Sequence, residues 1–168
     1  MMRAYLFAAM TALALVGIGC PQGLPAPTGE VPNASAPAVP VPPRAIRLDF
    51  SSGGLEKVPP LVFDRTDLEE LDLSGNRLTG ALPAEIRRLR NLRWLDASGN
   101  LMTGVPAEIG QLTELEDLDL SNNKLTGLPL ELGNLQKLRR LDLRGNDISR
   151  QDLDAIRAQL KSAEILVD

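Results

Sequence analysis

The sequence predicts an α/β solenoid, in which short parallel strands stack along a row of repeats. Prolines recur at intervals of 24, 23 and 23 residues, at Pro59, Pro83, Pro106 and Pro129. A leucine follows nine residues after each of these prolines. A six-residue run that begins Leu-Asp and ends in Asn then follows, at 71–76, 95–100, 118–123 and 141–146. Sequence repeats at a constant period of this size indicate a solenoid.

Each six-residue run contains the predicted strand. Side chains alternate between the two faces of a strand, so the leucines point to one side and the residues between them to the other. One repeat cannot bury its leucines alone, whereas stacked repeats bury a continuous core and pair their strands in parallel. The asparagine that ends each run is expected to satisfy buried backbone groups where the chain turns, which is a structural role. These residues are Asn76, Asn100, Asn123 and Asn146.

The pattern L-x-x-L-x-L-x-x-N-x-L-x-x-L-P-x-x-I-x-x-L resembles the leucine-rich repeat family, of the 23–24-residue kind. The resemblance extends from Leu48 to Ile148. It implies a short curved arc with a parallel sheet on its concave face, which is the usual binding face of the family. It is specific for fold and says little about function, because leucine-rich repeats serve unrelated pathways.

Both ends of the array depart from the repeat pattern, as the ends of solenoids do. Residues 44–67 form a degenerate first repeat, with Gly53 in place of asparagine, and are expected to cap the N-terminal end. Residues 68–148 form the repeats proper. In 149–168, Ser149 can cap a helix with Asp152 three residues later, so we expect a C-terminal cap. The tail at 165–167 is either a short final strand or packing against the last turn.

The first 20 residues have the features of an export signal. An uncharged, largely apolar run of 14 residues, 5–18, follows Arg3 and ends in small residues before Cys20. The run is shorter than the roughly 20 residues of a membrane-spanning helix. The segment Gly17-Ile18-Gly19-Cys20 resembles a bacterial lipobox, although that motif prefers leucine at the place of Gly17. The resemblance implies that Cys20 carries lipid and anchors the chain to a membrane.

The residue after the cysteine bears on the expected location. It is Pro21 and not aspartate, so the lipobox resemblance gives no signal for retention at an inner membrane. This favours an outer membrane or a cell surface. The alternative is cleavage without lipidation, which yields a soluble secreted protein. Residues 21–43 hold 8 prolines and one charge, so we expect a disordered, extended tether of up to about 70 Å.

Composition excludes several classes of function. The chain has no histidine and a single cysteine, so neither a Ser-His-Asp or Cys-His catalytic set nor an internal disulfide can form. The net charge of −4 argues against nucleic-acid binding. No nucleophile–base pair, phosphate loop or metal cluster stands out. We therefore expect a monomer that is not an enzyme and holds no cofactor and no metal.

The strand residues that face away from the core are the candidate binding residues. They fall into columns across the predicted sheet. The candidates are Glu70, Asp72, Trp94, Asp96, Asp117, Asp119, Arg140, Asp142 and Arg144. Trp94 is the only tryptophan, and aromatic side chains are favoured anchors at interfaces. The alternative for Trp94 is a side chain that only covers its neighbours.

One column is a ladder of aspartates, whose like charges repel unless something compensates them. The ladder is Asp49, Asp72, Asp96, Asp119 and Asp142. A basic peptide, a cation, or the flanking Arg140 and Arg144 would compensate it. Calcium is disfavoured, because it needs six to eight oxygens that converge on a point. A basic run at Arg87, Arg88, Arg90 and Arg93 is either a contact for anionic lipid headgroups or an ordinary solvated surface.

Three hypotheses for function remain open. The leading one is a protein or peptide interaction module, displayed on a bacterial cell envelope through a lipid on Cys20. The second is a structural envelope spacer without a specific ligand. The third is a non-catalytic scaffold subunit of an enzyme complex. The sequence does not identify a partner.

Overall fold

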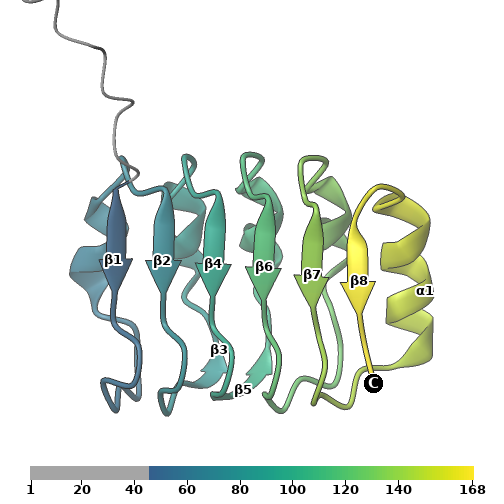
Figure 1. Cartoon of the computed structure of the whole chain (residues 1–168), viewed down its shortest axis with the longest axis horizontal. Helices are drawn as coiled ribbons and strands as arrows, with labels where there is room; N and C mark the ends of the chain where they lie inside the picture. Colours follow the sequence, from purple (N-terminus) through teal and green to yellow (C-terminus); the bar gives the residue numbers. More distant parts are fainter. Residues whose placement is uncertain (1–45) are drawn as a thin grey trace, which may run out of the picture. The chain divides into compact units, whose positions relative to one another are not determined.

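Each repeat contributes one short strand to a single parallel sheet. A computed structural model describes residues 46–168; the predicted signal at 1–20, with Cys20, and the predicted tether at 21–43 lie outside these residues. The sheet order is β1-β2-β4-β6-β7-β8, and all neighbours are parallel (Figure 1). The strands are Arg47–Asp49, Glu70–Asp72, Trp94–Asp96, Asp117–Asp119, Arg140–Asp142 and Glu164–Leu166. The C-terminal tail therefore forms a final strand, β8, which was one of the two alternatives expected for it.

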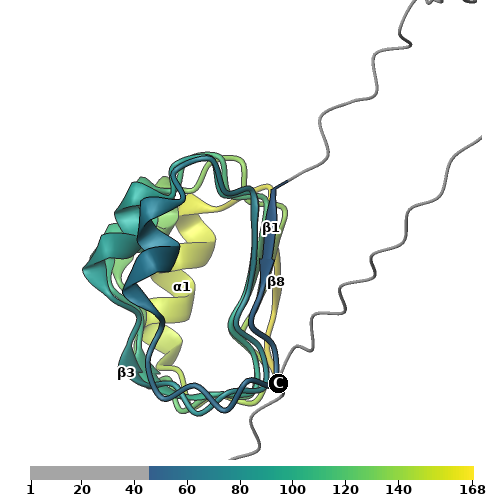
Figure 2. The same ribbon diagram turned by 90° about the vertical axis from the view of Figure 1, so that its left-hand side faces the viewer.

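Helical turns form the wall opposite the sheet, and the chain coils between the two walls (Figure 2). Each of the four turns follows a proline whose backbone is extended, and the fixed proline φ is suited to the start of a helical turn. The four 3₁₀ turns are η1 Pro60–Asp64, η2 Ala84–Arg88, η3 Ala107–Gln111 and η4 Leu130–Asn134. The last coil replaces this turn by the helix α1, Arg150–Gln159. Ser149 accepts a hydrogen bond from the Asp152 N–H, which confirms the predicted N-cap.

The core between the two walls is almost entirely aliphatic. The central leucine of each inner strand is fully buried, as are the leucines nine residues after three of the prolines. Among aromatic residues only Phe63, at 3% exposed, belongs to the buried core of residues 46–168. The central strand leucines are Leu71, Leu95, Leu118 and Leu141. Because each leucine layer covers the next, the repeats stabilise one another rather than folding singly.

The asparagine ladder satisfies backbone groups at the turn after each strand, as predicted. The Asn100 side chain is 4% exposed. Its Nδ2 donates to the carbonyl oxygens of Leu73 and Ala97, both at 3.0 Å. Its Oδ1 accepts from the Leu78 N–H at 3.0 Å. Each such amide therefore joins two successive repeats.

We expect Asn100→Ala to lower the free energy of unfolding by about 2 kcal/mol, because it leaves the buried N–H of Leu78 without a partner. The Leu73 and Ala97 carbonyls each lose one of two amide donors and keep the other, from Asn76 and Asn123. Urea denaturation of the full chain measures the change. Asn91→Ala is the matched control, since exposed Asn91 donates only to the Thr66 carbonyl. Equal losses for the two variants would contradict the structural role of the ladder.

A second, two-stranded sheet lies at the side of the coil, where none was predicted. The strands β3, Thr79–Ala81, and β5, Leu101–Gly104, pair in parallel. The pairing has a register shift between Gly80 and Ala81. The shift leaves Thr103 of β5 without an opposite residue on β3, because Gly80 pairs with Met102 and Ala81 pairs with Gly104.

Candidate functional site

The solvent-facing side of the six-stranded sheet, here called the sheet face, holds all the predicted binding residues. Strand register places Glu70 beside Trp94, and Trp94 beside Asp117. The second column pairs the aspartates of neighbouring strands in the same way. On the strands lie Glu70, Asp72, Trp94, Asp96, Asp117, Asp119, Arg140 and Asp142, and Arg144 follows β7. The sixth strand, β8, adds Glu164 and Leu166 to the two columns.

The aspartate ladder has a structural role that the sequence reasoning missed. Oδ1 of Asp96 accepts a hydrogen bond from the backbone N–H of Ser98 at 2.8 Å, and Oδ1 of Asp119 accepts one from Ser121 at 2.9 Å. Such bonds from an aspartate to the residue two positions on stabilise a turn. One carboxylate oxygen of each therefore fixes the end of its own strand. Only the other oxygen remains for a partner.

Arginines compensate the carboxylates at both ends of the sheet face. At the β1 end, Arg47 lies 3.1 Å from Asp72 and 3.6 Å from Glu70. At the β7 end, Arg140 lies 2.8 Å from Asp142 and 3.5 Å from Asp117. The centre carries no arginine of its own on β4 or β6. Arg140 also lies 3.8 Å from Asp119 of β6, so Asp96 on β4 is the aspartate of the described sheet face that no ion pair compensates.

Asp142 is buried, which differs from the expected ladder of exposed acids. Its side chain has 0% exposure. Oδ2 accepts from Arg144 Nη2 at 2.6 Å, and Oδ1 accepts from Arg144 Nε at 3.0 Å. These hydrogen bonds, above all, hold the pKa of Asp142 below its ordinary value. Asp142 thus anchors two arginines, and those arginines are the groups that a partner would meet.

Asp72 resembles Asp142 in this respect, because it is only 8% exposed. Its Oδ1 accepts from both the N–H and the hydroxyl of Ser74, and its Oδ2 pairs with Arg47. By contrast, Asp96 is half-buried, and within residues 46–168 no ion pair joins it to a cation. Asp96 is therefore the ladder carboxylate best placed to receive a positive charge from outside.

Trp94 lies half-buried at the centre of the first column. The guanidinium of Arg47 is 5.2 Å from the centre of its ring, within the range of a cation–π contact. A pocket of about 250 Å³ adjoins it, lined by Glu69, Glu70, Arg93, Trp94, Glu116 and Asp117. Sequence reasoning missed Glu69 and Glu116, which directly precede strand residues, and it placed Arg93 in a basic run, whereas Arg93 lines this pocket and donates to Glu116. Each of these three residues comes directly before the first residue of a strand, and this place in the sequence could have identified them.

Asp117 is the least satisfied carboxylate of the sheet face. Its Oδ1 is buried and accepts no hydrogen bond, although Arg140 Nη1 lies 3.5 Å away. Burial raises the pKa of Asp117, Arg140 opposes that rise, and neighbouring Asp119 and Asp96 add to it. A donor that reached this carboxylate from outside would favour its charged form.

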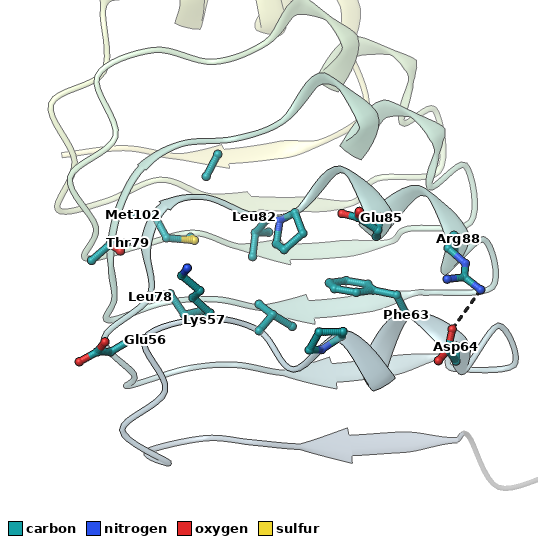
Figure 3. Close-up of a pocket in the computed structure, with 14 residues that line it drawn as sticks. Glu56, Lys57, Phe63, Asp64, Leu78, Thr79, Leu82, Glu85, Arg88 and Met102 are labelled. Carbon is teal, nitrogen blue, oxygen red and sulfur yellow. Dashed lines mark ion pairs between the residues drawn. The ribbon is translucent and has the colours of Figure 1, made fainter.

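A separate groove of about 470 Å³ lies away from the sheet face, between the first two coils (Figure 3). Its floor includes the buried side chains of Phe63, Leu82 and Met102, and an ion pair of 3.1 Å between Arg88 and Asp64 lies at one end. The groove borders β3, and no motif in the sequence indicated it. None of the predicted binding residues lines it.

A family model described as a leucine-rich repeat region matches residues 46–165. The chain therefore belongs to the leucine-rich repeat family, and its fold is the predicted α/β solenoid. This fold is that of a protein interaction module. A comparison with curated protein sequences finds no match.

Solved structures of similar proteins support the same assignment. A leucine-rich repeat protein of Leptospira interrogans is 46% identical, with a TM-score of 0.63; the match covers 66% of this chain and 28% of that one. A chain of the BIR3–SERK2 complex from Arabidopsis thaliana is 42% identical, with a TM-score of 0.57 and coverage of 62% and 57%.

A plant peptide hormone receptor, RGFR1 in complex with RGF2, is 31% identical, with a TM-score of 0.57 and coverage of 66% and 18%. This chain thus spans less than two thirds of each of these three proteins.

Among the helices of residues 46–168, none has the length and apolar character needed to cross a membrane. Within the same residues, no group of three or more acidic or cysteine side chains is arranged to hold a metal ion.

Proposed function

We propose that this chain is a non-catalytic module that binds a protein or peptide through its sheet face. The observation that carries the proposal is the centre of that face, where the half-exposed Trp94 stands on the same strand as Asp96, which no ion pair joins to a cation among the described residues. Aromatic side chains in such positions are preferred anchors of interfaces. Two of the similar structures support it, because one is a complex of two proteins and the other is a receptor bound to its peptide hormone.

The finer part of the proposal is display on a bacterial cell envelope through a lipid on Cys20, at an outer membrane or cell surface. It rests on the sequence alone, namely the apolar run that ends at Cys20 and the proline-rich segment after it. The boundaries drawn at 20, 43, 67 and 148 are likewise predictions. Mass spectrometry of the chain purified from a bacterial host tests the anchor. A diacylglycerol mass on Cys20 would support it, and an unmodified thiol would favour the secreted form.

Capture from native envelopes by the tagged full chain tests the binding role. The comparison is with Trp94→Ala/Asp96→Asn, in which the new amide oxygen keeps the acceptor for the Ser98 N–H. We expect a captured species whose amount falls at least tenfold with this variant, which equals about 1.4 kcal/mol. The matched control is Leu130→Ala/Asp154→Asn, which removes an exposed apolar side chain and one carboxylate away from the sheet face.

The outcomes separate the three hypotheses. Loss with the sheet-face variant and retention with the control support binding through the sheet face. If both variants capture as much as the unmodified chain, the sheet face is not the binding surface. If no species is captured, the envelope spacer becomes the better account. If the captured species is an enzyme, the chain acts as a non-catalytic scaffold subunit.

A further inference from the structure

The pocket beside Trp94 has the size and walls of a site for a single side chain. Its volume of about 250 Å³ is below the range of about 300–1,000 Å³ that is typical of sites for drug-sized ligands. One wall is the Trp94 indole, and Glu70 and Asp117 flank it from the neighbouring strands. We call this site the Trp94 pocket and define it by Glu69, Glu70, Arg93, Trp94, Glu116 and Asp117.

The charge of the Trp94 pocket is strongly negative. Its lining holds four carboxylates and one guanidinium, a net charge of −3 when all are ionised. The single cation, Arg93, is already engaged, because its Nε donates to Glu116 Oε1 at 2.9 Å. Arg139 lies 3.5 Å from the same carboxylate. Glu116 is thus compensated from within the chain. Glu70 lies 3.6 Å from Arg47 and Asp117 lies 3.5 Å from Arg140, but the Oδ1 of Asp117 accepts no hydrogen bond. Glu69 forms no ion pair among the described residues.

A contact within this chain indicates which chemical group fits the Trp94 pocket. Arg47 extends from β1 past Glu70 and places its guanidinium 5.2 Å from the centre of the Trp94 ring. The same guanidinium lies 3.6 Å from Glu70. An indole bordered by a carboxylate therefore already binds one guanidinium on this sheet face. On the next strand, Asp117 gives the ring a second carboxylate neighbour.

We propose that the Trp94 pocket receives an arginine side chain of the partner, stacked against Trp94 and paired with Glu70 and Asp117. The inference rests on the proposed function, because it names the chemistry of a partner at the same face. Arginine suits the site better than lysine, since its planar guanidinium stacks on an indole, donates to two carboxylates at once and sheds water more readily.

Fluorescence of Trp94 provides a direct test, because it is the only tryptophan of the chain. The probes are three peptides of nine residues in which a central arginine, lysine or citrulline is flanked by glycine and serine. Citrulline has nearly the shape of arginine but no charge. We expect saturable quenching by the arginine peptide, with the citrulline peptide at least tenfold weaker and the lysine peptide weaker by a smaller factor.

Two variants examine the carboxylates. Asp117→Asn and Glu70→Gln keep the size of each side chain and remove one charge, and we expect each to weaken binding of the arginine peptide about tenfold. Asp154→Asn removes an exposed carboxylate of α1 and is expected to leave binding unchanged. Circular dichroism of each variant confirms that the repeats remain folded.

Three outcomes of these measurements would contradict the proposal. Equal quenching by the arginine and citrulline peptides would overturn recognition of charge, and equal quenching by arginine and lysine would overturn the assignment to arginine. Unchanged affinity in both carboxylate variants would overturn the pocket. Failure here is distinct from failure of the proposed function. A partner captured through the sheet face without arginine recognition refutes only this inference, while arginine recognition without a captured partner refutes only the function.

Discussion

Gly110→Val is expected to destabilise the fold by about 3 kcal/mol, at the upper end of the usual cost of overpacking. Gly110 lies in η3 and is buried against η4 of the next coil. A Cβ at this position would lie 2.8 Å from the Cβ of Glu131, and the Glu131 carbonyl oxygen would be closer still. The obstacle includes backbone, which cannot move aside as the end of a flexible side chain can. The two turns must therefore separate.

Thermal unfolding of the full chain measures the effect of this substitution. We expect the midpoint to fall by on the order of 10 °C. The control is Gly104→Val in β5, where a Cβ would meet only the Ala81 Cβ at 3.9 Å, an ordinary contact. A midpoint for Gly110→Val close to that of Gly104→Val would show that η3 and η4 do not pack as tightly as the structure has them.

The repeat architecture was predictable because one residue pattern recurs in constant register. Stacking then follows from the need to bury the leucines, and the role of Asn100 follows from the polar groups left at each turn. The column that contains Glu70, Trp94 and Asp117 follows from strand alternation alone. Structural features that all the repeats share can therefore be predicted from the sequence.

Features that depend on how one particular coil meets the next were not predictable. Gly110 has an equivalent in Gly133, but the same place in η2 is Arg87, so the repeat pattern does not mark this glycine as required. The lateral pairing of β3 with β5 joins two neighbouring repeats and has no counterpart among the other repeats of the described residues. These contacts depend on the distances between coils, which a pattern of residues along the sequence does not contain.

The burial of Asp142 illustrates the same limit for the candidate site. The sequence places it in a column with Asp96, yet Asp96 is half-buried while Asp142 is fully buried. The difference arises because Arg140 and Arg144, on the same repeat, both contact Asp142. The predicted ladder of equivalent acids is thus divided. Asp72 and Asp142 are buried and hold arginines, whereas Asp96 forms no ion pair among the described residues.

Asp142→Asn is expected to lower the free energy of unfolding by about 3 kcal/mol near neutral pH, because it leaves two arginines without the carboxylate between them. Oδ1 of Asp142 also accepts from the Arg144 backbone N–H at 3.2 Å, a bond that the amide oxygen of asparagine can keep. The loss therefore reports the charge. Urea denaturation measures it, with Asp154→Asn as the exposed control, whose loss we expect to be below about 0.5 kcal/mol.

The pH dependence of this difference tests the cause. Hydrogen bonds from Arg144, above all, lower the pKa of Asp142 in the folded chain from its ordinary value of 3.8. A carboxyl group whose pKa is lower in the folded state stabilises the fold above the unfolded pKa, and that contribution is lost as the pH falls through the folded pKa. The unmodified chain and Asp142→Asn should thus differ fully at pH 6 and converge below pH 3.8. A difference that stayed constant through this range would mean that packing, and not the charge of Asp142, holds the two arginines on the sheet face.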